Sequence, residues 1–246
     1  MILVPQITMR PFWRYYGGKY RSAPMYPRPL DGLPIVEPFA GAAGYSVRFG
    51  AYRDVLLVEK DPKIAAIWIW LIQATPDDVL SLPDLEDGQT VDDLAIADAP
   101  KWLIGFWMNN GTSQPCQTPS KWARGGDARW FGWGDKCRRI IAGQVHAIRH
   151  WTVIDGDYSD CPDIAATWFV DPPYSTPAGD YYKHGNRGID FEHLGQWCRS
   201  RSGLAIACDQ SPADWLDFRP LADVKSTLGK SRELIWTNRT RPFPGV

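Results

Sequence analysis

The hydrophobic positions near the start of the chain fall into short runs typical of buried strands and longer stretches typical of helices. Residues 33–37 and 54–59 are predicted strands, and residues 45–49 and 62–74 are predicted helices. A turn of small residues, residues 38–44, separates the first strand from the first helix. Strand, glycine-containing turn, helix, strand and helix in this order predict the opening of a doubly wound α/β sheet.

The same alternation returns in the second half of the chain. Further strands are predicted at residues 152–154, 167–170, 203–208 and 233–236, with a helix at residues 191–200. The first thirty residues, in contrast, are loop-like and dense in Pro, Tyr and Arg. Both halves of the chain therefore contribute strands to the predicted α/β fold.

Residues 75–151 interrupt this alternation. The segment begins as an acidic linker and then becomes rich in Trp, Gly, Arg and Lys, with helices predicted at residues 101–108 and 135–150. We interpret it as an insertion in one α/β domain, which residues 1–74 and 152–246 form.

The composition narrows the range of partners. The formal net charge of −1 gives no global basic field, so any nucleic-acid site must be a local patch. The 13 tryptophans exceed what a core needs and indicate flat stacking surfaces. The 5 cysteines are odd in number and lack C-x-x-C spacing, which favours reduced thiols in a cytoplasmic protein. The longest apolar stretch, residues 64–74, is too short to span a bilayer, so no membrane partner is expected.

The most informative motif is Asp171-Pro172-Pro173-Tyr174, which ends the strand predicted at 167–170. Two successive prolines cannot donate to a sheet ladder, so the chain leaves the sheet stiff and extended. A carboxylate and a backbone carbonyl accept the two N–H bonds of a planar amine, and an aromatic ring stacks on its face. The motif therefore favours an amine-binding site over the alternative, an ordinary strand exit in which Pro is common.

Two features near the first strands predict a nucleoside-bearing cofactor. The turn at 38–44 allows close approach of an anion or carboxylate, because Gly41 and Gly44 reduce crowding there. Ala43, between them, is not expected to need a positive φ. Glu59 ends the following strand, where an acid commonly binds ribose hydroxyls.

Other polar residues leave more than one interpretation open. Asp157 and Tyr158 follow a third strand and either bind and flank an adenine or form a simple turn. Lys19 follows an aromatic-glycine turn and either pairs with a carboxylate or lies on a surface loop. His146 and His150 have no acid or Cys at ligand spacing, so no metal site is predicted.

Taken together, these motifs resemble the Dam-type family of DNA adenine-N6 methyltransferases, which use S-adenosylmethionine. The agreement covers most of the chain outside residues 75–151. The matching segments are Tyr16-Gly17-Gly18-Lys19, Glu37-Pro38-Phe39-Ala40-Gly41, Glu59, Gly156-Asp157-Tyr158, Asp171 to Tyr174, Phe191-Glu192-His193-Leu194 and residues 233–238. In two places the chain departs from the family, at Tyr15, where many members have Trp, and at Ala43-Gly44, and neither departure removes a catalytic group.

The resemblance implies a Rossmann-like doubly wound methyltransferase sheet with an inserted, mostly helical target-recognition region at 75–151. The implied catalytic residues are Asp171, Pro172 and Tyr174. The residues implied to bind S-adenosylmethionine are Tyr15, Gly18, Lys19, Glu37, Phe39, Ala40, Gly41, Gly44, Ser46, Glu59, Lys60, Asp157, Tyr158 and Asp171. The reaction implied needs no metal.

The implied partner is double-stranded DNA with a flipped adenine, because the amine is inaccessible inside a duplex. Basic residues expected to contact the DNA are Lys121, Arg124, Arg129, Lys136, Arg138, Arg139, Lys183 and Arg187. For each single Arg, a solvated helix face is the competing interpretation. A monomer in the cytoplasm of a bacterial or phage-infected cell is expected.

Three alternatives remain at this point. RNA adenine is a competing substrate, because an unpaired adenine looks alike in either polymer. Methylation of a protein glutamine amide is disfavoured, because amide methyltransferases tend to carry Asn at the position of Asp171. A nucleic-acid-binding protein that keeps the fold without catalysis is disfavoured by the intact Asp171, Tyr174, Glu59 and Lys19.

Overall fold

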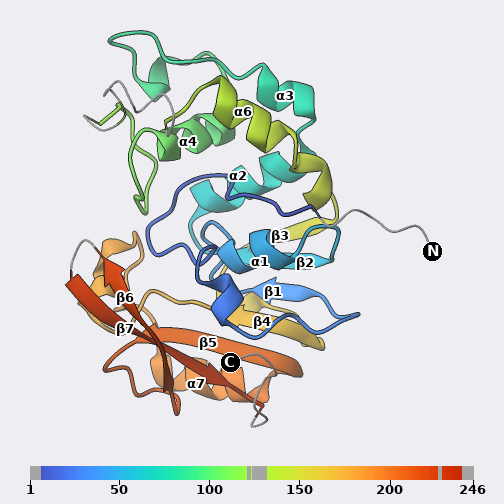
Figure 1. Ribbon diagram of the computed structural model, residues 1–246, viewed down its shortest axis with the longest axis vertical. Coiled ribbons are helices and arrows are strands. Elements are labelled where there is room, and N and C mark those ends of the chain that lie inside the picture. Colours follow the sequence, from blue (N-terminus) through green and yellow to red (C-terminus); the bar gives the residue numbers. More distant parts are fainter. Residues whose placement is uncertain (1–6, 121–122, 124–131, 227–228, 240–246) are drawn as a thin grey trace.

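A mixed seven-stranded sheet runs through the computed structural model, which describes residues 7–120, 123, 132–226 and 229–239 (Figure 1). The strand order is β3-β2-β1-β4-β5-β7-β6. All neighbours from β3 to β5 pair in parallel, whereas β7 runs antiparallel to both β5 and β6. The strands are β1 (Ile35–Glu37), β2 (Val55–Glu59), β3 (Trp151–Asp155), β4 (Ala166–Val170), β5 (Gly203–Gln210), β6 (Arg219–Ser226) and β7 (Gly229–Thr237).

Helices cover both faces of the sheet, as expected for an α/β protein (Figure 1). The α-helices are α1 (Gly44–Phe49), α2 (Pro62–Gln73), α3 (Pro76–Leu80), α4 (Asp98–Trp107), α6 (Asp135–Ala142) and α7 (Phe191–Ser200). Short 3-10 segments are η1 (Ala23–Met25), η2 (Val91–Asp93), η4 (Val145–Ile148), η5 (Tyr158–Asp160) and η6 (Pro177–Tyr181).

Alternate strand residues supply the two hydrophobic cores, because successive side chains of a strand point to opposite faces. On β4, Phe169 packs into the core beneath α1 and α2, while its neighbour Trp168 packs toward α7. On β5, Ile206 and Ala205 divide in the same way. Every residue of β4 is buried, which explains why this strand is a continuous apolar run in the sequence.

The described residues between 75 and 150 pack against the α2 side of the sheet rather than standing apart from it. In this part of the chain α4 packs on α2, and α6 packs on α3 (Figure 1). Leu103, Phe106 and Ile141 belong to the same buried cluster as the sheet and α2. A small second cluster of Val91, Leu94, Ile104 and Met108 is internal to the insertion. The insertion is therefore continuous with the main core.

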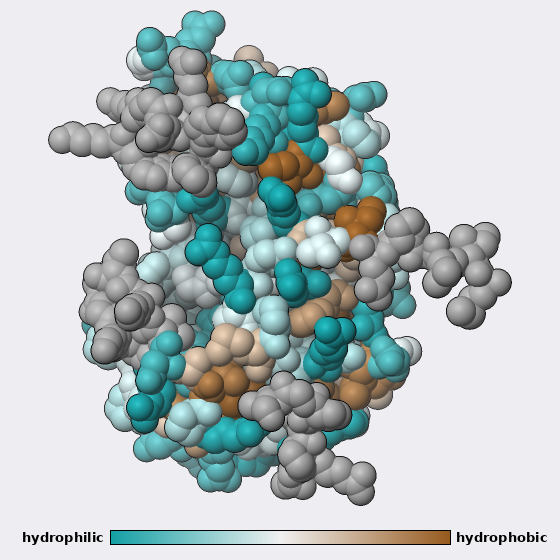
Figure 2. All heavy atoms as spheres, viewed as in Figure 1, coloured by the Kyte–Doolittle hydropathy of each residue, from teal (hydrophilic) through white to brown (hydrophobic). Residues whose placement is uncertain are grey.

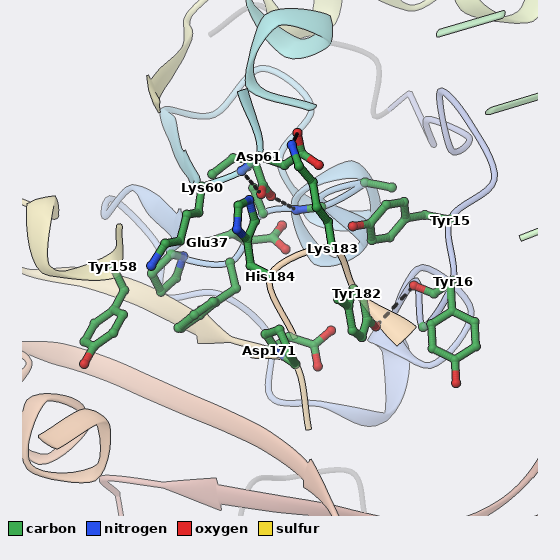
Figure 3. Close-up of a pocket in the computed structure, with 18 of the residues that line it drawn as sticks. Tyr15, Tyr16, Glu37, Lys60, Asp61, Tyr158, Asp171, Tyr182, Lys183 and His184 are labelled. Atoms are coloured by element: carbon green, nitrogen blue, oxygen red, sulfur yellow. Dashed lines mark hydrogen bonds and ion pairs between the residues drawn. The ribbon is translucent and has the colours of Figure 1, made fainter. Parts of the chain in front are cut away.

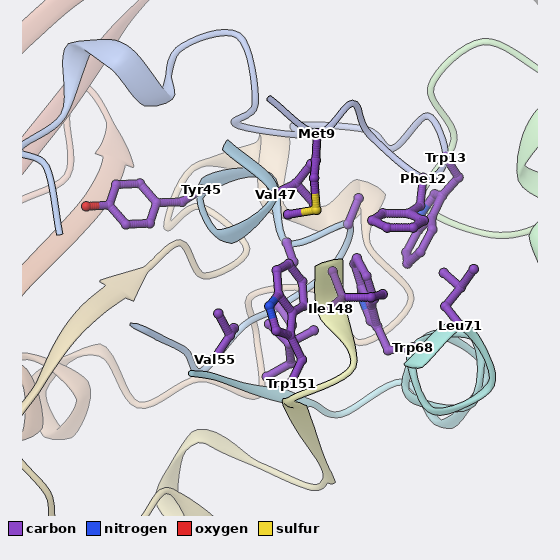
Figure 4. Packing of buried hydrophobic residues seen from close by; sticks show 14 of the residues in the cluster. Met9, Phe12, Trp13, Tyr45, Val47, Val55, Trp68, Leu71, Ile148 and Trp151 are labelled. Carbon is purple, nitrogen blue, oxygen red and sulfur yellow. The ribbon is translucent and has the colours of Figure 1, made fainter. Parts of the chain in front are cut away.

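Trp68 of α2 links this core to the turn that follows β1. Its ring is fully buried and contacts the rings of Phe12, Trp13 and Trp151 (Figure 4). Its indole Nε1 donates a 2.8 Å hydrogen bond to the carbonyl of Gly41. The N-terminal residues, predicted as loop, thus contribute large side chains to the core although they form no long regular element.

The helices and strands predicted from the sequence differ from those of the structure, most clearly in three places. The helix predicted at 135–150 ends at Ala142, because Gly143 caps it and the Gln144 side chain hydrogen-bonds both backbone groups of Arg10. The acidic linker contains α3, which a reciprocal Thr75–Asp78 capping box begins. Strand β6 was not predicted, since Arg219–Ser226 lies at the sheet edge and lacks a continuous apolar run.

The conformation of Ala43 also differs from expectation. Its φ is 46° and its ψ is 48°, in the left-handed region. Ala43 donates its N–H to the carbonyl of Ala40 and accepts from Val47 at the start of α1, so the turn and the helix together impose this conformation. A non-glycine residue there costs roughly 1–2 kcal/mol, which the surrounding packing must offset.

Gly44→Ala is expected to destabilise the protein by roughly 1–3 kcal/mol, measured by urea unfolding. An added Cβ would lie 2.6 Å from the Tyr20 backbone nitrogen and 2.8 Å from that of Lys19, and backbone cannot move aside as a flexible side chain can. The matched control is Gly188→Ala, where nothing lies within 4 Å of the added carbon. Equal stabilities of the two variants would contradict this packing.

Hydrophilic side chains cover most of the face seen in Figure 2, and the hydrophobic patches on it are small and separate. Among the described residues, no helix is both long and apolar enough to cross a membrane.

Candidate active site

The site lies where the strand connections change direction. From β1 the chain moves to β2 and β3 on one side and returns to β4 on the other, so a crevice forms between the carboxyl ends of β1 and β4. Glu37 is the last residue of β1, and Asp171 directly follows β4. The sheet topology therefore brings together two acids that are far apart in the sequence.

A pocket, here called the inner pocket, opens at this crevice (Figure 3). Tyr158 lies at one end of it, and Tyr15 and Tyr16 lie at the other. All residues predicted to bind the cofactor except Ser46 line it: Tyr15, Gly18, Lys19, Glu37, Phe39, Ala40, Gly41, Gly44, Glu59, Lys60, Asp157, Tyr158 and Asp171. Ser46 instead lies behind the wall, fully buried, and its backbone N–H donates to Glu37 Oε1 at 2.6 Å.

Glu59 is held by the backbone at the middle of this pocket. Its two carboxylate oxygens accept hydrogen bonds from the N–H groups of Gly41, at 2.7 Å, and Asp61, at 2.8 Å. Burial nevertheless raises the pKa of Glu59 to about 7, and burial raises the pKa of Glu37 to about 8. Both acids therefore titrate near neutral pH, and their carboxylates favour ligands that donate hydrogen bonds to them.

Two aromatic rings form one end of the inner pocket. The rings of Phe39 and Tyr158 stack with centroids 5.4 Å apart. The Tyr158 hydroxyl lies 2.7 Å from Nδ1 of His193, which is on α7. At the rim, Lys60 forms a 2.8 Å ion pair with Asp157. This end offers apolar faces beside a carboxylate, which suits a planar heterocycle.

Asp171 forms a buried ion pair with Lys19. The Lys19 ammonium lies 2.9 Å from Oδ2 and 2.8 Å from Oδ1, and the latter contact lacks hydrogen-bond geometry, so Oδ1 is without a hydrogen-bond donor among the described residues. Burial raises the pKa of Asp171 to about 6. Burial alone would lower the pKa of Lys19, but the neighbouring Asp171 carboxylate outweighs it, and the pKa of Lys19 is raised.

The same lysine faces two further residues. Its ammonium lies 4.8 Å from the centroid of the Tyr174 ring and 3.6 Å from Oε1 of Glu233 on β7. That oxygen also accepts hydrogen bonds from the hydroxyls of Tyr174, at 2.8 Å, and Tyr26, at 2.7 Å. Acid, base and aromatic ring thus form one connected cluster. Pro172 is buried beside it and lines neither cavity described here.

A second, wider cavity, here called the outer groove, lies on the other side of this cluster. It has a volume of about 870 Å³ and reaches Tyr174 and Glu233. Lys19 and Tyr182 line both the inner pocket and the outer groove, so the two cavities share a wall at the ion pair. Among the described residues, the charged side chains that line the outer groove are those of Arg10, Arg14, Lys19, Arg21, Lys136 and Glu233. Five of these six are cationic, in a chain of net charge −1.

The basic residues predicted to contact nucleic acid lie in different surroundings in the structure. Lys136 lines the outer groove. Arg138 is buried and binds both oxygens of Asp84, so it fixes the acidic linker to α6 and does not face a ligand. Arg139 is exposed and pairs with Asp135 one turn earlier on α6. Arg187 is exposed and pairs with Asp180.

Lys183 lines the inner pocket and is not among the residues that line the outer groove. Its ammonium binds Asp61 Oδ1 at 3.0 Å, and Gln114 Nε2 donates to Asp61 Oδ2 at 2.7 Å (Figure 3). Although burial opposes it, these hydrogen bonds hold the pKa of Asp61 below its usual value. Lys121, Arg124 and Arg129 lie outside the described residues.

Sequence reasoning missed several residues of this site. Glu233 was quoted as part of a motif but assigned no role, and Tyr182 and Asp61 were not considered. Arg10, Arg14 and Arg21 fall in the loop-like N-terminal segment, where only their density in the sequence was a signal. No periodic pattern could place them, because the described residues of this segment form one short 3-10 turn and are otherwise irregular.

No protein-family profile matches this chain, and neither does any curated protein sequence. Within the described residues, no group of three His, Cys, Asp or Glu side chains is placed to hold a metal ion.

Proposed function

We propose that this chain transfers a methyl group from S-adenosylmethionine to the exocyclic amine of an adenine flipped out of double-stranded DNA. The observation that carries the proposal is the position of Asp171, which directly follows a buried strand, lines the inner pocket and pairs with Lys19, a residue that also lines the cationic outer groove. Transfer of a methyl group to a polyanionic acceptor needs one cavity for the donor and another for the acceptor, both close to the same acid. The sheet order around the crevice also supports a Rossmann-like fold, because ligands of such folds bind at that crevice.

The residues of the inner pocket fit the proposed cofactor. Glu59 is a partly buried acceptor that suits ribose hydroxyls, and the Phe39–Tyr158 pair suits an adenine face. The Tyr15 ring packs closely on Gly41, because a Cβ on Gly41 would lie 2.8 Å from that ring. S-adenosylmethionine, when bound there, supplies an electrophilic methyl group on a sulfonium sulfur.

The chain's own residues would activate and hold the acceptor. The adenine amine is a poor nucleophile because its lone pair is delocalised into the ring. An Asp171 oxygen and the Pro172 carbonyl would each accept one of its N–H bonds and increase the electron density on nitrogen. Tyr174 would stack on the base. Positioning of two bound reactants would supply most of the rate gain.

The outer groove supports a nucleic-acid acceptor. Its cationic residues come from the N-terminal segment and α6, and they flank the side of the cluster that carries Tyr174. Such a local excess of positive charge attracts phosphates even when the whole protein is slightly acidic. A base extruded from the strand would reach Asp171 from this side.

Arg21→Ala is expected to weaken DNA binding and to lower the slope of log affinity against log salt by about one, because one phosphate contact is lost. The affinity would be measured by fluorescence anisotropy between 50 and 200 mM salt, roughly the range over which such contacts weaken. The matched control is Arg139→Ala, an exposed arginine paired with Asp135 and outside the groove lining. A larger loss of slope in the control would place the DNA elsewhere.

The part of the cofactor affinity that depends on Glu59 is expected to rise with pH up to about 7 and then to level off, because burial raises the pKa of Glu59 to about 7. Ribose hydroxyls donate to a carboxylate, so below this pKa the protonated acid must first ionise, at a cost of about tenfold in affinity per pH unit. Calorimetric titration with S-adenosylhomocysteine measures this. Glu59→Gln should bind more weakly and lose the Glu59-dependent rise; an unchanged pH profile in that variant would remove Glu59 from the ribose site.

The proposed function is tested by incubating the wild-type protein with labelled S-adenosylmethionine and a panel of double-stranded DNA, single-stranded DNA and RNA. Label in double-stranded DNA is the expected result. Label in RNA alone would reassign the substrate. Cofactor binding without transfer to any polymer would contradict the enzymatic proposal.

A further inference from the structure

Lys19 lies between two carboxylates and is closer to one of them than to the other. Its ammonium lies 2.8 Å from the nearer oxygen of Asp171 but 3.6 Å from Oε1 of Glu233. The side chain of Lys19 is 8% exposed, and those of Asp171 and Glu233 are 18% and 10% exposed. Water therefore screens these charges little, and whichever carboxylate lacks the ammonium must find other donors.

The present position of Lys19 conflicts with the proposed reaction. Asp171 is adjacent to the prolines and the aromatic ring that would receive the acceptor amine, and the ammonium fills the hydrogen-bonding side of its Oδ2. It also lies over the Tyr174 ring, where the incoming base would stack. Oδ1 of Asp171 has no donor among the described residues and stays open to an amine, but the base that carries the amine would meet the ammonium over the Tyr174 ring.

Glu233 is placed to pair with the Lys19 ammonium when it leaves Asp171. Its Oε1 accepts hydrogen bonds from the hydroxyls of Tyr26 and Tyr174, so the carboxylate stays in place when the lysine moves. A shift of the ammonium by about 1 Å converts the 3.6 Å separation into a hydrogen-bonded ion pair. Lys19 can make this move by side-chain rotation, because its backbone packs against Gly44 and need not change.

We propose that Lys19 is a two-position switch, which occupies the amine-binding side of Asp171 in the free protein and moves to Glu233 when the acceptor amine arrives. This inference rests on the proposed function for the identity of the acceptor. Lys19 would keep the Asp171 carboxylate occupied until a base is present. Glu233 would be a positioning residue that acts through Lys19. As an ammonium, Lys19 has no lone pair and is not itself a methyl acceptor, in keeping with its raised pKa.

The two-partner claim is tested first without DNA, from the Nζ signals of ¹⁵N-lysine-labelled protein. A buried, paired ammonium exchanges its protons slowly and gives a signal, which Lys19→Met assigns. Asp171→Asn should shift this signal but keep it, because Glu233 takes over the pairing, and Asp171→Asn with Glu233→Gln should remove it. Loss of the signal in Asp171→Asn alone, or its survival in the double variant, would overturn the proposal.

The switch itself is tested by base flipping, measured as the fluorescence of 2-aminopurine at the target position of a DNA duplex. Glu233→Gln keeps an acceptor for the tyrosines but loses the charge that receives Lys19, so the affinity for the flipped base should fall about tenfold. In a Lys19→Met background the same change should have little effect, because no ammonium needs a partner. Tyr26→Phe, which removes one hydrogen bond to Glu233 but no charge, is the matched control and should flip the base nearly as the wild type does.

An equal defect of Glu233→Gln in both backgrounds would show that Glu233 only supports the fold, and would overturn the switch. Methyl transfer by the wild type is measured in parallel. If the wild type methylates DNA but Glu233→Gln has the same effect with and without Lys19→Met, the switch fails and the proposed function stands. If the wild type methylates nothing, the proposed function fails, and the lysine spectra still decide whether Lys19 has two partners.

Discussion

Asp171→Asn is expected to lower the rate of methyl transfer by about 10³-fold or more, while binding of S-adenosylmethionine stays largely intact. Asparagine keeps the size of the side chain but loses the charge that would draw electron density onto the acceptor nitrogen, and enzymes lose rates of this order when one preorganised electrostatic contact is removed. Most contacts proposed for the cofactor come from Glu59, Phe39 and Tyr158 instead. Single-turnover kinetics and calorimetry measure the two effects separately.

The matched control is Asp180→Asn, in the loop that follows the same motif. Asp180 is 45% exposed and pairs with the exposed Arg187, so its neutralisation should leave the transfer rate near that of the wild type. Asp171→Ala should resemble Asp171→Asn in rate but also lose stability, because it leaves the Lys19 ammonium buried without its closest partner. Turnover near the wild-type rate in either Asp171 variant would remove this carboxylate from the mechanism.

Trp68→Ala is expected to reduce the free energy of unfolding by about 4 kcal/mol, because it empties a fully buried site that three other aromatic rings surround. That is a large share of the roughly 5–15 kcal/mol that stabilises a typical domain. The variant also loses the hydrogen bond to the Gly41 carbonyl, so cofactor affinity should fall with stability. Urea unfolding and calorimetry are the measurements.

Two variants separate these effects. Ile69→Ala, one residue further along α2, removes a side chain that is 41% exposed, and it should change stability by no more than about 0.5 kcal/mol. Trp68→Phe keeps an aromatic ring in the core but cannot donate to Gly41, so the relative loss of cofactor affinity should exceed the relative loss of stability. Unfolding of Trp68→Ala at the same urea concentration as Ile69→Ala would contradict the structure of this core.

The sequence predicted the parts of the fold that depend on local pattern. Strands β2 and β4 are apolar runs that end at Glu59 and Asp171, and parallel strands in a sheet of this topology bring such ends to one edge. The helix at 191–200 was predicted with the bounds that the structure has, because its first turn carries the Asp190 cap and its apolar face is regular. The inner pocket follows from these elements.

What could not be predicted depends on contacts between distant segments. Glu233 lies at the site only because β7 is placed between β5 and β6 in the sheet. No local sequence pattern predicts this strand order. Arg138 looked like a DNA contact because it follows Lys136 on a basic helix, whereas its partner Asp84 lies 54 residues away. Each outcome is set by tertiary geometry.

The most direct test of the central claim is nucleoside analysis by mass spectrometry of unmethylated double-stranded DNA after incubation with S-adenosylmethionine. The account predicts N6-methyladenine in DNA treated with the wild type and none in DNA treated with Asp171→Asn. N4-methylcytosine as the product would contradict the assignment of the acceptor, and N6-methyladenine made equally well by Asp171→Asn would contradict the assignment of the active site.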